Sequence, residues 1–162
     1  MRLVFWSALA AFCADQLSKY IVVHAMNLKE VLAIDVLPPF LNFRMGWNTG
    51  INFGIMASDA PWMRWVLIAI ALSIIAFVLW WIKTDPHGRG QKLSAGLLIG
   101  GALGNVFDRL VYGAVADFLN MSCCGFTNPT AFNVADIAVF MGAIGLVIFT
   151  TDKNKRQGDL GT

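Results

Sequence analysis

Charged residues are scarce in this sequence: they make up 14% of its 162 residues, whereas about a quarter of residues are charged in a typical soluble domain. Lys and Arg number 12 and Asp and Glu number 10, and this balance excludes the basic surface that nucleic-acid binding requires. The two histidines lie far apart, and the three cysteines lack metal-ligand spacing. We therefore predict no bound metal, no other cofactor and no nucleic-acid partner.

What the sequence has in abundance is apolar residues, at 57%, with a mean hydropathy of +0.65. Apolar runs of about 20 residues are long enough to cross a lipid bilayer as helices. The runs lie at about residues 3–23, 62–82, 93–112 and 134–150. We predict an all-α integral membrane protein, residues 1–162 forming a single domain with a four-transmembrane-helix bundle.

The Lys and Arg residues between the runs set the expected orientation, because cytoplasmic loops carry an excess of them. In a four-span arrangement one side carries Arg2, Lys83, Arg89, Lys92, Lys153, Lys155 and Arg156, and the other carries Lys29, Arg44 and Arg64. Both termini should therefore face the cytoplasm, and residues 152–162 should form a loose polar tail. Residues 24–61 should form an outer platform on the bilayer surface.

This outer segment carries a weak strand signal. Residues 40–45 partly alternate apolar and polar after the Pro38-Pro39 break, which favours a short strand or hairpin arm. We therefore expect the extracytoplasmic platform to contain a small amount of β structure.

Ionisable residues inside the apolar runs are the main functional signal, since each costs at least a few kcal/mol in a membrane. Counted at about 1.5 Å per residue from the cytoplasmic ends, Asp15, Asn105 and Asp108 all lie roughly 20 to 24 Å in. Lys19 and Arg109 lie slightly further out. With Asp117 and Asp136 at the neighbouring helix ends, these residues predict one polar cluster at the outer surface.

Several of these residues also have purely structural explanations. Asp15 and Lys19 have the spacing of a helical ion pair, and we favour that role over a chemical one. Asn105 and Arg109 share a helix face, which fits a site or a buried polar stripe equally well. Asn133 and Asp136 have the spacing of a helix cap.

Gly96, Gly100 and Gly104 recur at every fourth residue and predict close approach of a neighbouring helix.

Asp117 has no such local explanation. If it meets Asp136 in a partly dry site, the two carboxylates cannot both ionise cheaply and should share a proton near neutral pH. A carboxylate and a carboxylic acid side by side form the unit of acid-base hydrolysis: one activates water and the other protonates the leaving group.

Five segments resemble, in order, those of the lipoprotein signal peptidases, also called signal peptidase II. They are DQLSK (residues 15–19), NTGINFG (48–54), GGALGNVFDR (100–109), VADF (115–118) and FNVAD (132–136). The resemblance implies an aspartic endopeptidase of the bacterial cytoplasmic (inner) membrane. Its substrates would be prolipoproteins, cut immediately before their S-diacylglyceryl cysteine.

Carried over residue by residue, the resemblance assigns the catalytic pair to Asp117 and Asp136. The positions that hold the substrate or support the pair fall on Asp15, Lys19, Asn48, Gly50, Asn105, Asp108, Arg109 and Asn133. It implies no metal, and membrane lipid as the surroundings; we expect a monomer. Asn52 departs from the alanine common in the family, which leaves the shape of the outer platform open.

A proton-coupled small membrane transporter is the main alternative, because acids inside spans also mark ion paths. Such a path needs ionisable groups at several depths, whereas here they gather near one side. Other protease classes are excluded by missing motifs: His-Glu-x-x-His, Gly-x-Ser-x-Gly and Gly-x-Gly-Asp are all absent.

Overall fold

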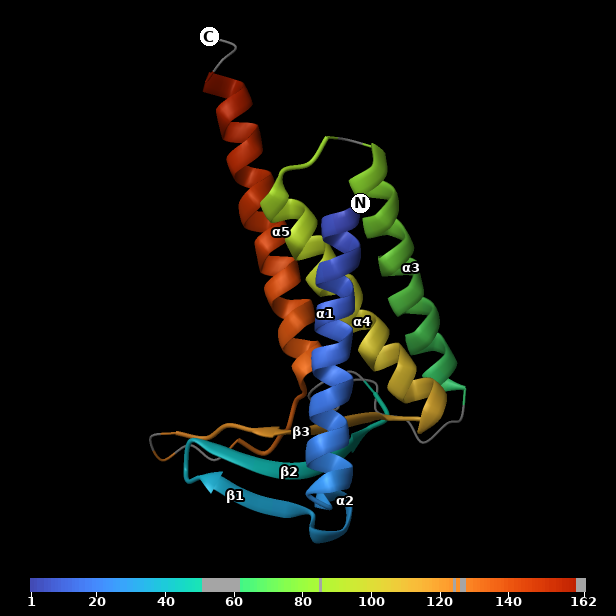
Figure 1. The fold of residues 1–162 in the computed structure, drawn as a ribbon, viewed down its shortest axis with the longest axis vertical. Helices are drawn as coiled ribbons and strands as arrows, with labels where there is room; N and C mark the ends of the chain where they lie inside the picture. The colour runs from blue at the N-terminus through green and yellow to red at the C-terminus, as the bar shows by residue number, and fades with distance from the viewer. Residues whose placement is uncertain (51–61, 85, 124, 126–127, 160–162) are drawn as a thin grey trace.

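The computed structural model describes residues 1–50, 62–84, 86–123, 125 and 128–159. Most of this part of the chain forms long helices that stand on a small sheet (Figure 1). The long helices are α1 (Arg2–Lys19), α3 (Met63–Thr84), α4 (Arg89–Val111) and α5 (Val134–Asp159). After α1, the π-helix η1 (Tyr20–Ala25) and the short helix α2 (Leu28–Val31) lead to the sheet. The predicted mostly helical fold with a small β platform is confirmed at this level.

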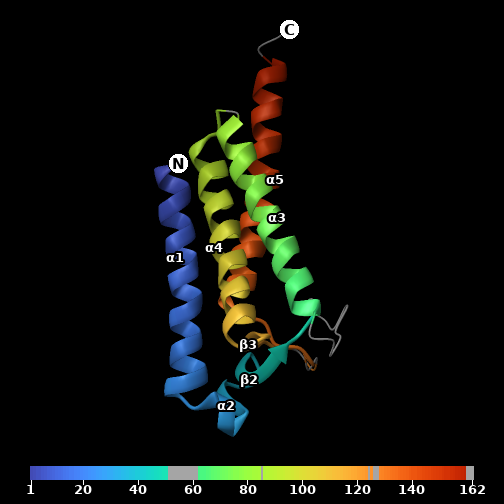
Figure 2. The same ribbon diagram turned by 90° about the vertical axis from the view of Figure 1, so that its right-hand side faces the viewer.

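Helix α4 occupies the centre of the helical layer, and it packs against α5, α1 and α3. Figure 2 shows α4 between α1 and α3. The predicted glycine face explains how α1 comes so close. A Cβ added at Gly100 would overlap the carbonyl oxygen of Ala8, and one at Gly96 would lie 2.6 Å from the carbonyl oxygen of Val4. Both helix backbones touch here, so only hydrogen fits at these positions.

The hydropathy of the helices differs. Within the described residues, α3 is the one helix long and apolar enough to cross a membrane by length and composition, with a hydropathy of 2.6. The apolar part of α5, Val134–Thr150, is shorter. In α1 and α4 the apolar sequence is interrupted by charged residues, among them Asp15, Lys19 and Asp108.

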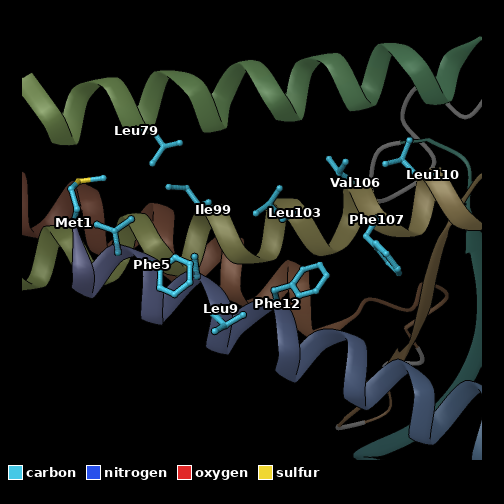
Figure 3. A pocket seen from close by; sticks show the side chains of 12 residues that line it. Met1, Phe5, Leu9, Phe12, Leu79, Ile99, Leu103, Val106, Phe107 and Leu110 are labelled. Atoms are coloured by element: carbon cyan, nitrogen blue, oxygen red, sulfur yellow. The ribbon is translucent and has the colours of Figure 1, made fainter.

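An apolar groove of about 550 Å³ separates α1 from α3 (Figure 3). Phe5, Leu9 and Phe12 line it from α1, and Leu103 lines it from α4. Leu79 closes it from α3. The groove leaves a continuous apolar surface on the helical layer.

The sheet has three antiparallel strands in the order β1-β2-β3. Strands β1 (Ala33–Leu37) and β2 (Leu41–Asn48) form a hairpin, and β3 (Val115–Asn120) follows α4. One face packs on η1 and α2 through a cluster that includes Val23, Leu28 and Phe118. The strand signal at residues 40–45 is confirmed. Strand β3 was not assigned to the platform, because its pairing with β2 joins segments far apart in the chain.

The C-terminal segment differs from the prediction of a loose tail, because α5 continues to Asp159. That prediction was wrong for most of residues 152–162. Extending an existing helix avoids the cost of nucleation, and Lys, Arg and Gln are good helix formers. The last positions of the platform prediction, residues 51–61, lie outside the described residues.

Candidate active site

Asp117 and Asp136 are joined through one residue, Asn133. The Asn133 side chain donates from Nδ2 to Asp117 Oδ1 at 2.6 Å, and its Oδ1 accepts the backbone N–H of Asp136 at 2.9 Å. Asp136 returns this bond, because its Oδ2 accepts the backbone N–H of Asn133 at 3.3 Å. This reciprocal pair is a helix cap, as the spacing predicted. The same residue, Asn133, therefore caps the start of α5 and orients the carboxyl group of Asp117 on β3.

Two further amides hold the aspartates from other elements. Asn48, at the end of β2, donates from Nδ2 to Asp117 Oδ2 at 3.0 Å. Asn105 of α4 donates from Nδ2 to Asp136 Oδ1 at 3.0 Å, and its Oδ1 accepts from Asn133 Nδ2 at 3.3 Å. Four elements, β2, β3, α4 and α5, thus meet at these carboxylates. Asp117 is 4% exposed, whereas Asp136 is only half-buried.

The electrostatics of Asp117 follow from this position. The pKa of its carboxyl group is raised from 3.8 to about 7, chiefly by burial and next by the nearby charge of Asp136. The hydrogen bonds from Asn48 and Asn133 oppose the rise, since they stabilise the ionised form. Near neutral pH, Asp117 therefore holds a proton for part of the time, as the shared-proton hypothesis requires.

Arg109 lies beside this group on the same face of α4 as Asn105. It donates from Nη1 to the backbone oxygen of Asn105 at 3.3 Å and from Nη2 to that of Gly50 at 2.9 Å. Among the described residues, Nε of Arg109 has no hydrogen-bond partner although it is buried. Arg109 thus ties the chain after β2 to α4 and keeps one donor free.

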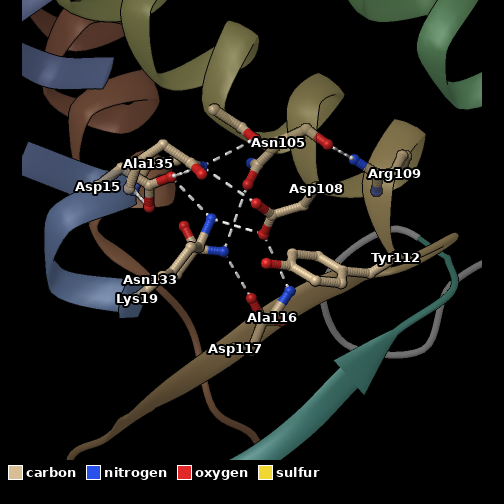
Figure 4. Close-up of polar contacts among 12 residues, drawn as sticks. Asp15, Lys19, Asn105, Asp108, Arg109, Tyr112, Ala116, Asp117, Asn133 and Ala135 are labelled. Carbon is tan, nitrogen blue, oxygen red and sulfur yellow. Dashed lines mark hydrogen bonds and ion pairs between the residues drawn. The ribbon is translucent and has the colours of Figure 1, made fainter. Parts of the chain in front are cut away.

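A second polar group, which contains Asp15, Lys19 and Asp108, lies beside Asn133 and Asp117 (Figure 4). Lys19 is almost fully buried, and its Nζ lies 2.7 Å from Asp15 Oδ2 and 2.8 Å from Asp108 Oδ2. The predicted ion pair of Asp15 and Lys19 is confirmed, and Asp108 completes a triplet. Gln16 donates from Nε2 to both carboxylates at 3.0 Å. The buried ammonium group of Lys19 thus lies between two buried carboxylates, and the Gln16 amide bonds to both of them.

The triplet supports the two backbones that carry the aspartates. Asp15 Oδ1 accepts the N–H of Ala135 at 2.9 Å, one residue before Asp136. Asp108 Oδ2 accepts the N–H of Ala116 at 3.1 Å, one residue before Asp117. The sequence therefore correctly grouped these charged residues. It missed Gln16, whose signal was a polar side chain next to Asp15 in an otherwise apolar run.

The described residues contain no group of three or more His, Cys, Asp or Glu side chains suited to a metal ion. The hydroxyl group of Tyr112, at the C-terminal end of α4, lies 3.4 Å from Nε2 of His24. Every candidate residue named from the sequence, from Asp15 to Asp136, lies in one of the two groups around Asn133 and Lys19.

Comparison with known proteins gives a consistent result. Residues 7–151 match the family model described as signal peptidase (SPase) II. A lipoprotein signal peptidase from Alteromonas mediterranea is 43% identical over 146 residues, which cover 88% of this chain and 77% of the relative. One from Pseudoalteromonas atlantica is 39% identical over 144 residues, covering 88% and 85%. One from Burkholderia mallei is 38% identical over 133 residues, covering 82% and 78%.

The fold has solved counterparts as well. A bacterial membrane enzyme, determined by the in meso method at 2.3 Å resolution, superposes with a TM-score of 0.80. It is 27% identical, and the match covers 94% of this chain and 90% of that one. A second bacterial membrane enzyme structure, at 1.9 Å resolution, gives a TM-score of 0.73 at 28% identity, with 90% of each chain covered.

Proposed function

Because this chain belongs to the signal peptidase II family and is a lipoprotein signal peptidase, we propose that Asp117 and Asp136 are its catalytic pair. They would hydrolyse the peptide bond before the S-diacylglyceryl cysteine of a bacterial prolipoprotein. The observation that carries this proposal is the junction at Asn133, which bonds to Asp117 and caps Asp136. The comparisons give the transporter alternative no support.

The surroundings of the two carboxyl groups suggest how they divide the work. Asp136 is half-buried, so its carboxyl group is open to the attacking water and can draw a proton from it. Asp117 has a pKa raised to about 7, so it can supply a proton to the carbonyl oxygen as water attacks. The proton that Asp136 took from the water then passes to the leaving amine, and Asp117 regains a proton from the tetrahedral intermediate as the C–N bond breaks. The acid and the base thus differ because burial differs between β3 and the start of α5.

Arg109 and Asn105 would hold the substrate backbone against this pair. Arg109 has a free Nε donor and is fixed through its Nη atoms to Asn105 and Gly50. A guanidinium group held in this way is well suited to bind a peptide carbonyl oxygen. Orientation of the scissile carbonyl toward the two acids would then come from α4 and from the chain after β2.

We propose that α1, α3, α4 and α5 all cross the membrane, with both termini in the cytoplasm. Large apolar side chains are exposed on all four, including Trp6 of α1, Phe77 of α3, Leu110 of α4 and Phe140 of α5. Such surfaces are costly in water and suit a lipid environment. The residues of the two polar groups come from β2 and β3 and from the ends of α1, α4 and α5 nearest to the sheet. Figure 1 shows that these helix ends adjoin the sheet, so both groups would face the outer surface of the inner membrane.

In this arrangement the substrate stays anchored in the bilayer while its cleavage site reaches the aspartates at the edge. The prolipoprotein is thus the expected partner, with membrane lipid around the helices. We propose that one copy of the chain is sufficient, since the residues of both polar groups come from a single chain.

The direct test is mass spectrometry of a diacylglyceryl-modified precursor incubated with the purified protein in lipid nanodiscs. We expect one cut, immediately before the modified cysteine, and the same cut in the presence of a metal chelator. The unmodified precursor serves as the control and should be cut poorly. Cleavage at another bond, or a requirement for added zinc, would contradict the proposal.

A further inference from the structure

A second pocket lies over the sheet, beyond the aspartate pair. Its volume is about 370 Å³, and it opens between β2, β3 and the chain that follows β3. The residues that matter for its chemistry are Asn42, Arg44, Gly46, Asn120, Asn128 and Ala131. None of them belongs to the two polar groups around Asn133 and Lys19.

The strand register places this pocket on the same face of the sheet as the Asp117 carboxyl group. Gly46 pairs with Asp117 and Asn42 pairs with Asn120, and directly paired residues of antiparallel strands point to the same face. The pairing of β2 with β3 shifts between Phe43 and Gly46, but the alternation along β2 is kept: Phe43 and Met45 pack on the cluster below the sheet, and Asn42, Arg44 and Gly46 line the pocket on the other face.

Asp117 and Asn120 are three residues apart on β3, and in a regular strand their side chains would point to opposite faces. A bulge between them explains why they point to the same face. The backbone N–H groups of Phe118 and Leu119 both donate to the carbonyl oxygen of Phe132, at 3.0 and 2.8 Å. One extra residue on a strand reverses the alternation of the residues that follow it. The bulge therefore turns Asn120 toward the side of Asp117, and Phe118 stays in the core below the sheet.

The pocket offers an unused hydrogen-bond acceptor and little net charge. Asn42 is 8% exposed, and its Oδ1 has no partner among the described residues. The amide of Asn120 is already used, because its Nδ2 donates to the carbonyl oxygens of Asn128 and Thr130 at 2.8 and 2.9 Å. The charge of Arg44 is balanced by Asp35, with Nη2 and Oδ1 2.6 Å apart. A suitable ligand therefore brings a donor and no strong charge.

We propose that this pocket binds the extended segment of the substrate that follows the cleaved bond. Asn120 lies three residues from Asp117, which at about 3.4 Å per residue places the pocket roughly 10 Å from the reacting group. A peptide in extended form would reach Asn42 about three residues after the cleaved bond. Its backbone N–H would donate to the free Oδ1 of Asn42. The inference rests on the proposed function and adds a subsite to it.

The layout of the fold favours this direction of the substrate. The signal helix precedes the cleaved bond and belongs beside the long helices, so the residues after the bond must leave elsewhere. Figure 1 shows that the hairpin end of the sheet extends past α5, away from the helical layer. The pocket lies along this part of the sheet and thus on the exit side of the aspartates.

A phospholipid head group is a poorer match for the same pocket. A phosphodiester presents acceptor oxygens, and these would meet the acceptor Oδ1 of Asn42 without forming a hydrogen bond. The balanced charge of Arg44 also removes the main attraction for a phosphate. A peptide backbone supplies the missing donor at every residue.

The test compares two lipid-modified precursor peptides with the purified enzyme in nanodiscs. One peptide ends at the residue after the modified cysteine, and the other continues for about six more residues, enough to cross the pocket. Asn42→Leu keeps the size of the side chain and removes its acceptor. Ala131→Leu narrows the pocket from the opposite wall. Lys29→Gln, on the exposed surface of α2, is the matched control.

For the wild type and Lys29→Gln, the longer peptide should have the lower KM. Asn42→Leu should raise the KM of the longer peptide about three- to tenfold, the effect of one lost hydrogen bond, and leave its kcat and the short peptide unchanged. Ala131→Leu should do the same. Normal cleavage of the short peptide shows that each variant is folded and that the proposed function holds.

Two results would overturn the inference. In the first, both peptides have the same KM with the wild type, or Asn42→Leu affects both equally. In the second, the effect of Asn42→Leu follows the phospholipid head group of the nanodisc and not the length of the peptide, which would assign the pocket to lipid. Failure to cleave either peptide would instead reject the proposed function.

Discussion

The side-chain amide of Asn133 donates to the Asp117 carboxyl group at 2.6 Å, the shortest of the hydrogen bonds around the aspartate pair. Asn133 is fully buried and immediately precedes α5, whereas Asp117 lies in the middle of β3. Because the same side chain also caps Asp136, the start of a helix and the centre of a strand are fixed to each other. The distance between the two carboxyl groups is thus set by secondary structure and does not depend on a flexible loop.

Asp117→Asn and Asp136→Asn should each reduce kcat for a lipid-modified precursor by at least about a hundredfold, because each variant loses a proton donor or acceptor. The amide keeps the size of the carboxyl group, so the fold should be retained. Mass spectrometry of the product measures the loss, and thermal unfolding in detergent is the control. Near-normal turnover by either variant would remove that aspartate from the chemistry.

The pH dependence of cleavage should reflect the raised pKa of Asp117. Above about pH 7 the second proton of the pair is lost, so kcat should fall on the alkaline side. Asn48→Ala removes a hydrogen bond that lowers this pKa, so the alkaline limb should move to higher pH. Rate profiles of the two proteins between about pH 5 and 9 test this. A shift to lower pH, or no shift, would show that Asn48 does not act on Asp117.

The same pKa has a consequence for stability. Below about pH 4, Asp117 is protonated in both the folded and the unfolded chain. Between about pH 4 and 7 the unfolded chain releases this proton and the folded chain retains it, so the free energy of unfolding falls as the pH rises. Asp117→Asn should abolish this contribution. Unfolding midpoints of both proteins across the same range provide the check.

Lys19→Met should destabilise the protein by about 3 to 5 kcal/mol, because it leaves Asp15 and Asp108 buried without a cation. Denaturant unfolding in mixed micelles measures the change. Asp35→Asn is the matched control, since it breaks an exposed ion pair with Arg44 and should cost less than about 1 kcal/mol. A loss of less than about 1 kcal/mol for Lys19→Met, as small as that of the control, would mean that the triplet around Lys19 contributes little.

Gly100→Ala should lower stability by about 1 to 3 kcal/mol, because the added methyl group meets the backbone of α1 at Ala8. Gly88→Ala, whose nearest neighbour would be the Gln91 side chain at 3.8 Å, is the control. Unfolding in detergent compares them. If Gly100→Ala is as stable as Gly88→Ala, the close packing of α1 on α4 is not required.

Much of the site could be predicted from residues that conflict with their surroundings. Asp15, Lys19 and Asp108 are expensive in an apolar run, and matching depths in separate helices indicated that they meet. Asn133 and Asp136 had the spacing of a cap, which is a local property of the chain. Gln16 was missed because one polar side chain beside a charged one adds no periodic signal of its own.

Pairing across long sequence separations could not be obtained in this way. Strand β3 has no hairpin partner nearby and joins β2 across two long helices, so its place in the sheet depends on the complete fold. The bulge at Phe118 is likewise decided by Phe132, which comes back along β3 from the other side. Without this bulge, Asn120 and the pocket at Asn42 would lie on the opposite face from Asp117.

The amino-acid sequence by itself determined the composition of the site and its chemical class, because charge in an apolar chain must find partners and two aspartates on the same side of the membrane favour acid-base chemistry. It placed Asp117 near a helix end, whereas the residue lies in β3. The tertiary structure decided how the roles are divided. Only packing buries Asp117 more deeply than Asp136, and only packing brings Asp15 to Ala135 and Asp108 to Ala116. Burial and backbone support arise where distant segments meet, and no local pattern in the chain records them.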